Sequence, residues 1–511
     1  MNLPKLWMVF WSLGAWAQAP EIARNGIVNA ASNTPTALAD SGIARGAVLT
    51  IFGARFGARA SDVSAKLKGQ GTEAALPILS ANASTITARV PANAPLGAAS
   101  LTVAVNGRIS SAYPVKVLPA QFGIYSNNGN GWGPGRIQNV TGTGRTPNAV
   151  ANAAELGQVL ALAGTGLGDA RKPMVLVGGR AAKEIEARAS PDGDEILFQV
   201  PPNAPAGCFV PVQVFNAGRL PSNTVTVAIR RGGGACLEPE YFPFAGWPGA
   251  RFGIVAITRT VQREYGVQPV SDEVGAWFGR LPGVERLNPY MLLPPPGTCT
   301  SQAEAWRGES VPDSFVPLLA SHTGAKALHA GDELTIDDGK TLRRVPAYRN
   351  LQGVYDRELS DLMGRADRLL HFISPSIVHL AGKGGTDVGR FSFALNGPQP
   401  FEMRGAMGPV ERGHPLTLEW TDLGPGRIAL VLANFVDEAT SSRGMCYCSA
   451  MPGATGLTVP ASALAYFPTA GRGTRVSVTV IAWPLRPVTF QAAGLDRTLA
   501  VSAFMQAWRR E

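Results

Sequence analysis

The chain is poor in charge and in histidine, and these shortages exclude several kinds of protein. Asp, Glu, Lys and Arg make up only 16% of the 511 residues, which is too few to give long helices their usual polar faces. The net charge is +9, but the basic residues are scattered singly, so the sequence has no nucleic-acid footprint. Beyond the N-terminal region, no stretch stays apolar over the roughly 20 residues that a membrane-spanning helix needs.

Motifs for common chemistry are missing as well. The sequence contains no G-x-S-x-G nucleophile elbow, no H-E-x-x-H zinc motif and no P-loop. An acidic pair for glycoside hydrolysis is defined by its separation in space, so Glu402, Glu411 and Glu419 stay open as candidates for one. No metal or cofactor is expected, because the histidines are scattered without i, i+4 spacing: His322, His329, His371, His379 and His414.

Glycine and proline, by contrast, are abundant. The chain holds 59 Gly and 40 Pro, a composition that favours many short strands joined by tight turns. We therefore predict an all-β protein. Its length allows several domains of roughly 100 to 200 residues each.

The first residues predict export. Lys5 precedes an apolar run over residues 6–14, and Ala15-Trp16-Ala17 has the A-x-A pattern of a signal-peptide cleavage site. The run is shorter than a membrane span, so we predict that residues 1–17 are a signal peptide and not an anchor. The mature protein is then expected to be secreted, periplasmic or attached to the cell surface, with no membrane insertion.

A duplicated octapeptide organises the first half of the chain. Residues 90–97 read V-P-A-N-A-P-L-G, and residues 200–207 read V-P-P-N-A-P-A-G, which is a separation of 110 positions (200 − 90). A second pair, at residues 48–53 and 159–164, is separated by 111 positions (159 − 48). A period near 100 residues suits an immunoglobulin-like β-sandwich and is well above the length of solenoid repeats.

Turn signals support two copies of one sandwich. In the first copy, Asn106-Gly107 separates strand-like residues 99–105 and 110–117, and Asn-Gly is a strong hairpin signal. The second copy has the corresponding strands at 209–215 and 224–229, and it adds a Gly/Asn-rich loop around Trp132. An exposed Trp132 could stack on a sugar ring, although a loop tryptophan more often packs onto its own domain.

The ordered motifs of residues 24–236 resemble a family of proteins. They read G-I-V-N-A-A-S, V-L-T-I-F-G-x-x-F-G, V-P-x-N-A-P-x-G, L-P-A-Q-F-G-I-Y and V-L-A-L-A-G-T-G-L-G. This series resembles the paralogous secreted proteins of Acidobacteria, of the Solibacter type, which carry tandem immunoglobulin-like domains of the IPT/TIG class. The resemblance implies two such domains, at residues 24–118 and 119–231, and no catalytic residue.

The C-terminal part, residues 237–511, keeps a β-like composition without the repeat. Gly232-Gly233-Gly234 before it predicts a flexible hinge, and residues 382–391 and 416–420 also resemble a recurrent β-rich module of the same proteins. We predict a β-sandwich region with one or two lobes, split near residue 374, and Trp420 and Trp483 are expected in its core. Leu351 to Phe372 has a 3.6-residue apolar period that predicts one short helix.

Two turns with acidic residues in this region are candidate functional sites. Asp337-Asp338-Gly339 predicts a hairpin turn, and with Asp332 and Glu333 it suggests calcium, but the spacing does not fit an EF-hand loop. Asp387 lies in a glycine-rich turn, where capping its own turn is the usual role of such an aspartate.

Export makes the cysteines candidates for disulfides. Cys208 opens one strand of a predicted hairpin and Cys236 follows its partner strand, so a Cys208–Cys236 bridge is geometrically reasonable, and similar family members hold cysteines at these places. Cys299 is expected to pair with either Cys446 or Cys448, and we take Cys446 as the first choice.

The sequence therefore predicts two tandem immunoglobulin-like (IPT/TIG) sandwiches followed by a C-terminal β-sandwich region. The leading functional hypothesis is a non-catalytic extracellular or cell-surface module that binds a glycan or a protein, with Trp132 as a speculative contact. One alternative is a glycan-acting enzyme with its site in residues 237–511. Another is a structural spacer of the cell surface.

Overall fold

The structure is all-β, as predicted. The computed structural model describes residues 18–57, 59–142, 144–168, 172–190, 193–216, 221–237, 249–263, 269–281, 294–306, 316, 320, 325–348, 351–359, 377–469 and 473–510. The regular elements named in this part of the chain are strands, apart from one 3-10 turn, η1 (Ala60–Asp62). None of its helices is long and apolar enough to cross a membrane. The predicted signal peptide, residues 1–17, lies outside the described residues.

The first repeat is a sandwich of two sheets. One sheet has the order β1 (Glu21–Asn29), β3 (Val48–Ala54), β7 (Thr85–Arg89), β6 (Ile78–Ala81). The other has the order β2 (Ile43–Ala44), β10 (Tyr113–Leu118), β8 (Gly97–Val105), β4 (Val63–Gly69), β5 (Thr72–Leu76), with β9 (Arg108–Ile109) paired to β8. β4 alternates buried and exposed residues along its whole length, because successive side chains of a strand point to opposite faces.

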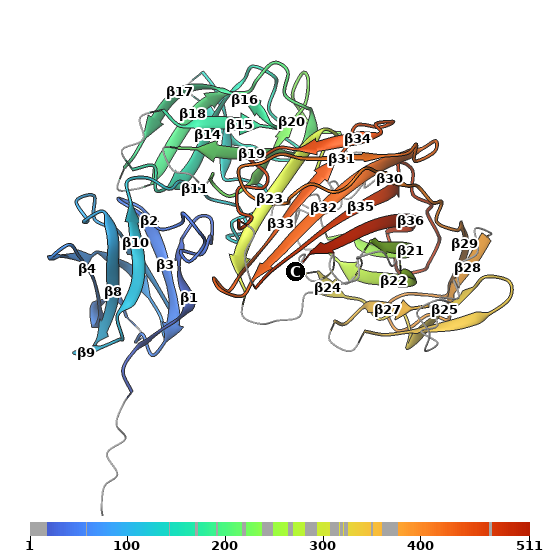
Figure 1. Ribbon diagram of the computed structural model, residues 1–511, viewed down its shortest axis with the longest axis horizontal. Helices are drawn as coiled ribbons and strands as arrows, with labels where there is room; N and C mark the ends of the chain where they lie inside the picture. The colour runs from blue at the N-terminus through green and yellow to red at the C-terminus, as the bar shows by residue number, and fades with distance from the viewer. Residues whose placement is uncertain are drawn as a thin grey trace, which may run out of the picture.

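The second repeat has the same plan. One sheet has the order β13 (Gly144–Pro147), β12 (Ile137–Thr141), β14 (Val159–Thr165), β18 (Asp194–Gln199), β17 (Lys183–Arg188), with β11 (Gly123–Ile124) paired to β14. The other has the order β16 (Arg180–Ala181), β15 (Met174–Val177), β19 (Gly207–Phe215), β20 (Val225–Ile229). Figure 1 shows both repeats at one end of the molecule, in blue and green.

The duplicated octapeptide makes the same crossing in both repeats. It leads from β7 into β8 and from β18 into β19, and so from one sheet of each sandwich to the other. The amide of Ala94 donates to the carbonyl of Pro91 at 3.1 Å, and that of Ala204 donates to Pro201 at 3.0 Å. The two copies of the motif therefore form the same turn. The first valine of each copy is fully buried.

The Asn106-Gly107 hairpin is confirmed. Both residues have positive φ, 49° and 79°, as a two-residue type I′ turn requires. The returning segment is shorter than predicted, because β9 covers only two residues and the chain then continues into β10.

A nine-stranded sheet dominates the C-terminal region. Its order is β23 (Thr298–Ala305), β33 (Ser442–Ser449), β32 (Arg427–Asp437), β35 (Thr474–Pro484), β36 (Arg497–Arg510), β21 (Arg251–Arg263), β22 (Val270–Arg280), β24 (Lys326–Ala327), with β27 (Val354–Glu358) also paired to β22. The neighbours β21 and β36 run parallel, and the other pairs are antiparallel.

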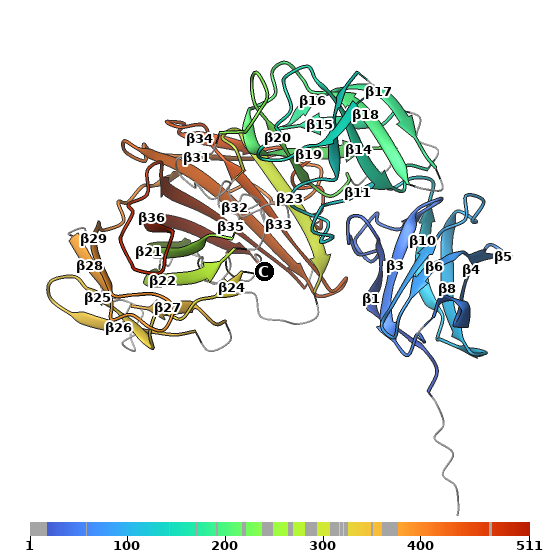
Figure 2. The same cartoon turned by 180° about the vertical axis from the view of Figure 1, so that it is seen from behind.

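Two smaller sheets cover one face of this large sheet, at its two ends (Figures 1 and 2). A three-stranded sheet of β30 (Met403–Arg404), β31 (Leu416–Trp420) and β34 (Gly456–Val459) packs near β32, β33 and β35. A four-stranded sheet of β26 (Leu342–Pro346), β25 (Glu333–Asp337), β28 (Ile377–Gly382) and β29 (Phe391–Asn396) packs near β21 and β22. Trp420 and Trp483 are both 0% exposed and fill the core as predicted.

The predicted helix over residues 351–372 is wrong in its first part. Val354 to Glu358 form β27, which pairs with β22 from Glu273 to Trp277. Backbone pairing to a distant strand overrides the local apolar period, which is a weak signal by comparison. The remainder of that prediction, residues 360–372, lies outside the described residues.

The predicted triglycine hinge is also wrong. Gly232, Gly233 and Gly234 all have positive φ, so glycine is used here for a tight turn. The amide of Ala153 donates to the carbonyl of Gly234 at 2.7 Å, and the amide of Cys236 donates to Val150 at 2.8 Å. These bonds tie the segment to the second repeat.

Asn29, in the motif G-I-V-N-A-A-S, joins the two repeats. Its buried side-chain amide donates to the carbonyls of Gln121 at 3.4 Å and Thr165 at 3.3 Å. Its side-chain oxygen accepts from the amides of Ala31 at 2.9 Å and Ser32 at 3.3 Å. One side chain therefore satisfies backbone groups on both sides of the junction.

Asn29→Ala is expected to lower the free energy of unfolding by about 1–3 kcal/mol, because it leaves buried backbone groups of both repeats without their partner. Urea unfolding followed by fluorescence measures the change. Asn82→Ala is the matched control, since Asn82 caps only the exposed turn before β7. Equal midpoints for the two variants would show that the junction does not depend on Asn29.

Candidate functional site

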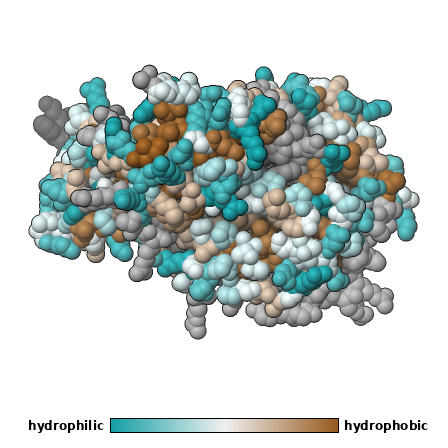
Figure 3. All heavy atoms as spheres, turned by 90° about the horizontal axis from the view of Figure 1, so that it is seen from above, coloured by the Kyte–Doolittle hydropathy of each residue, from teal (hydrophilic) through white to brown (hydrophobic). Residues whose placement is uncertain are grey.

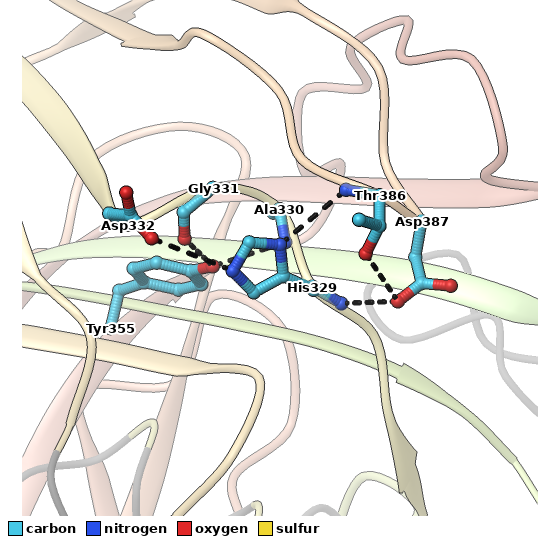
Figure 4. Close-up of polar contacts among 7 residues, drawn as sticks. All are labelled: His329, Ala330, Gly331, Asp332, Tyr355, Thr386 and Asp387. Atoms are coloured by element: carbon cyan, nitrogen blue, oxygen red, sulfur yellow. Dashed lines mark hydrogen bonds and ion pairs between the residues drawn. The ribbon is translucent and has the colours of Figure 1, made fainter.

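A group of polar side chains lies between two loops of the C-terminal region (Figure 4). One loop, residues 329–332, precedes β25, and the other, residues 383–390, joins β28 to β29. The carboxylate of Asp387 accepts from the backbone amide of His329 at 2.9 Å. In return, the amide of Asp387 donates to the carbonyl of His329 at 3.1 Å.

Tyr355 of β27 belongs to the same group of polar side chains. Its hydroxyl donates to the carbonyl of Gly331 at 2.6 Å and accepts from the amide of Ala330 at 3.1 Å. The side chain is 2% exposed, and this burial raises the pKa of Tyr355. The hydroxyl therefore stays protonated and serves as a fixed hydrogen-bonding group.

Glycines let the two loops approach closely. A Cβ at Gly385 would lie 2.4 Å from the backbone nitrogen of Gly331 and 2.5 Å from the Nδ1 atom of His329. Such distances are shorter than any side chain tolerates, so glycine is required at this point for packing. The glycine-rich segment 382–389 is thus explained by the contact between the loops.

The chemistry available to this group is limited. The carboxylate of Asp387 binds the backbone of His329 and not its imidazole, so the pair does not form a His–Asp dyad of the kind that orients a general base. The Nε2 atom of His329 lies 3.8 Å from the Oδ1 atom of Asp332, a fully exposed carboxylate. No group of three or more His, Cys, Asp or Glu able to hold a metal occurs among the described residues.

We therefore call residues 329–332, Tyr355 and residues 384–387 the loop clip. The sequence predicts that Asp387 caps its own turn. Its carboxylate instead accepts from a backbone amide of the opposite loop, that of His329. No sequence pattern indicates the roles of His329 and Tyr355, because their partners lie in separate segments of the chain.

Trp132 lies at the junction of the repeats and is half-buried. The carbonyl of Gly129 accepts from the side chain of Asn33 at 3.1 Å, and the carbonyl of Gly131 accepts from Asn223 at 2.7 Å. The loop that carries Trp132 is thus held by the first repeat and by its own repeat. This position leaves only part of the indole accessible.

The structure gives the other acidic candidates different surroundings. Asp337 accepts from the amide of Gly339 at 2.8 Å, and Asp338 accepts from the amides of Lys340 and Thr341, so both cap their hairpin turn and do not point to calcium. Glu402 and Glu419 are exposed residues on and beside the three-stranded sheet. Glu411 lies 3.9 Å from His414. His322 and His371 lie outside the described residues.

The cysteines form two disulfides in the described part of the chain. Cys208 is bonded to Cys236, and Cys299 is bonded to Cys448. The first choice of Cys446 as the partner of Cys299 is wrong: Cys446 is a free, buried thiol. The register explains this result, since Cys299 of β23 lies directly opposite Cys448 of β33, whereas Cys446 lies opposite Ser301.

Cys446 is expected to resist alkylation in the folded protein. Burial raises the pKa of its thiol to about 12, so the reactive thiolate is scarce at pH 8, and the thiol is also inaccessible. Iodoacetamide should leave the native protein unmodified and label one thiol in urea, as mass spectrometry would show. Labelling at the same rate with and without urea would contradict the buried position.

Comparisons with known proteins find fold-level likeness at most. No protein-family model and no curated protein matches the chain. Among solved structures, the chain is similar to the plexin A4 extracellular region, at 15% identity and a TM-score of 0.17, over 42% of this chain and 19% of that one.

It is also similar to two SGBP-B proteins. One is from a mixed-linkage glucan utilization locus of Bacteroides ovatus, in complex with a heptasaccharide, at 14% identity and a TM-score of 0.20, over 37% of this chain and 44% of that one. The other is from a xyloglucan utilization locus of Bacteroides uniformis, at 12% identity and a TM-score of 0.18, over 67% and 86%. The chain spans less than half of the plexin and of the Bacteroides ovatus protein, and these likenesses are too slight to assign a function.

Proposed function

We propose that this protein is an exported, non-catalytic interaction module that presents a fixed surface to a glycan or to another protein outside the cell. The observation that carries the proposal is that buried polar and apolar side chains make contacts between three β-sandwich parts of the chain. A chain of loosely linked modules would not need such contacts.

The second repeat shares an apolar cluster with the large sheet. Cys208 and Phe209 of β19 lie in one buried cluster with Met445 and Tyr447 of β33. The hydroxyl of Tyr466 also donates to the carbonyl of Pro221 at 3.3 Å. These contacts hold the outer face of the β19 sheet against the C-terminal region.

The first repeat contacts the C-terminal region independently. The side-chain amide of Asn25 donates to the carbonyls of Thr440 at 2.9 Å and Ser441 at 2.6 Å. Arg412 forms an ion pair with Asp40 at 2.7 Å, and Leu38 is buried in the cluster beneath the three-stranded sheet. With the Asn29 junction, these contacts fix both repeats in place.

The two disulfides support the proposed location. Disulfides form and persist in oxidising compartments such as the periplasm and the extracellular space. Figure 3 shows several separate apolar areas among polar side chains on the face that it draws, without one continuous apolar surface. Such a surface suits local contacts with a soluble partner better than insertion into lipid.

Binding of the mature protein to arrays of polysaccharides and of envelope proteins tests the proposal. We expect one class of ligand to bind above background and to be released unchanged. Protein denatured in the presence of reductant is the control and should not bind. Cleavage of a bound glycan would favour the enzyme alternative, and no binding on either array would leave only the spacer.

For a glycan ligand we propose Trp132 as a contact, since indole rings stack on sugar faces through their apolar surface. Trp132→Ala should then weaken glycan binding by about tenfold, and Trp132→Phe should retain most of it. If both variants bind as the wild type does, the contact lies elsewhere.

A further inference from the structure

In two places on the large sheet, an arginine faces an acidic residue of the neighbouring strand. Arg259 of β21 lies opposite Asp272 of β22, and their side chains form an ion pair at 2.7 Å. Arg443 of β33 lies opposite Glu304 of β23, also with an ion pair at 2.7 Å. Opposite charges on facing residues stabilise a sheet, whereas like charges in that position destabilise it.

One end of the neighbouring strands β21, β22 and β24 has the reverse arrangement (Figure 1). Arg251, the first residue of β21, lies directly opposite Arg280, the last residue of β22. Arg280 in turn lies opposite Lys326 of β24. Because facing residues of antiparallel strands point to the same side of the sheet, these three side chains form a line, which we call the cationic row.

Backbone carbonyls hold the two arginines of the cationic row. The guanidinium of Arg251 donates to the carbonyl of Asp387 in the loop clip, and the Nε atom of Arg280 donates to the carbonyl of Gly249 at 2.9 Å. The Nε atom of Arg251 is buried and has no hydrogen-bond partner among the described residues. Both guanidiniums are therefore held in place while donors remain unused.

The cationic row is not neutralised by the protein. None of its three side chains forms an ion pair in the part of the chain that the structure describes. Two carboxylates adjoin the row, and both bind backbone amides: Asp496 accepts from Arg251 at 2.7 Å, and Asp387 accepts from His329 at 2.9 Å. Since Arg280 and Lys326 are exposed, an anion from solution can reach the row.

We propose that the cationic row binds the anionic groups of an acidic polysaccharide. The inference rests on the proposed function, to which it adds a class of ligand and a contact separate from Trp132. Neighbouring strands are about 4.8 Å apart, so the three positions span about 10 Å. This length suits anionic groups repeated along a polymer better than one small ion. Guanidinium groups bind carboxylates through paired N–H donors, and sulfate esters offer similar oxygen acceptors.

Binding of the mature protein to polygalacturonate and to its fully methyl-esterified form tests the proposal. The charged polymer should bind at least about tenfold more tightly, because esterification removes the charge and keeps the sugar chain. Dextran sulfate against dextran is the corresponding comparison for sulfate groups. A preference in either comparison supports the proposal, and the tighter ligand identifies the anion. The affinity should also fall between about 50 and about 200 mM salt, since salt screens exposed charges.

Arg280→Gln and Lys326→Gln should each weaken binding of the charged polymer by about tenfold, because each removes a charge-assisted contact. Lys116→Gln is the matched control. Lys116 is exposed on β10 of the first repeat, so its variant has the same change of net charge away from the cationic row and should bind as the wild type does. Urea midpoints of all variants check that the fold is retained.

Three results would overturn the proposal. One is equal affinity for the charged and uncharged polymers in both comparisons, and another is that the row variants lose no more affinity than Lys116→Gln. The third is tighter binding to double-stranded DNA than to either acidic polysaccharide. A protein that binds a neutral glycan or another protein, but no acidic polysaccharide, would keep the proposed function and remove this inference.

Discussion

Arg259→Met is expected to lower the free energy of unfolding of the C-terminal region by about 3–5 kcal/mol, because it leaves a buried carboxylate without its guanidinium. Arg259 of β21 and Asp272 of β22 lie directly opposite each other. The Nε and Nη2 atoms of Arg259 donate to the two carboxylate oxygens of Asp272 at 2.7 and 2.8 Å. The Asp272 side chain is 0% exposed.

The position of this pair explains why it matters. On the same face of β21, Ile257 belongs to the apolar cluster under the four-stranded sheet, and Val261 belongs to the cluster under the three-stranded sheet. The ion pair therefore lies where the two covering sheets meet, shielded from water. The attraction between two charges is strong in such surroundings, and so is the cost of isolating one of them.

Urea unfolding of Arg259→Met against the wild type measures the effect. The double variant Arg259→Met/Asp272→Leu is the control, and it should recover most of the loss, because apolar residues often replace a buried ion pair at little cost. If Arg259→Met lowers the free energy of unfolding by less than about 1 kcal/mol, the buried Asp272 carboxylate does not need the Arg259 guanidinium as its partner.

Removing the Cys299–Cys448 disulfide is the second change with a large expected effect. The bond spans a sequence separation of 149 residues, and the chain-entropy model assigns about 5 kcal/mol to a loop of that length. It fixes the end strand β23 to β33. The Cys208–Cys236 bond spans 28 residues and should contribute about 3.5 kcal/mol in the same model.

The double variant Cys299→Ser/Cys448→Ser and the double variant Cys208→Ser/Cys236→Ser, unfolded in urea without reductant, test this order. Cys446→Ala is the control, because it removes a buried sulfur without opening a bond, and should cost about 1–2 kcal/mol. If the two double variants lose equal stability, loop length does not govern the contribution of these disulfides.

The features that the sequence predicted well are those that depend only on residues adjacent in the chain. The octapeptide shows the repeat because all of its turn is local, and Asn106-Gly107 shows a hairpin because both residues adopt positive φ readily. Trp420 and Trp483 were predictable as core residues because each lies in a strand of apolar or alternating pattern.

The features that it predicted poorly depend on partners far along the chain. Whether Cys446 or Cys448 meets Cys299 depends on the register of β23 against β33, and a shift of two residues would exchange them. The strand β27 pairs with β22, about 80 residues earlier in the chain, and this pairing outweighs its local pattern. Three glycines suit a hinge and a tight turn equally, so Gly232 to Gly234 could not distinguish them.

The candidate site shows the same division. Asp387 could be singled out from its glycine-rich surroundings, but its bond to the backbone of His329 joins residues 58 positions apart. Asn29 lies in a recognisable motif, yet its partners Gln121 and Thr165 are 92 and 136 positions away. Sequence patterns located these residues, and only the fold reveals that they hold separate segments together.

The place of β36 in the large sheet sets the order in which this protein can mature. Residues 497–510 lie in the interior of the sheet, between β35 and β21, with the latter in parallel. Until this strand has been synthesised, β21 and β35 lack the neighbour that joins them, and the two halves of the sheet remain separate. The nine-stranded sheet therefore cannot be completed before residues 497–510 have been made.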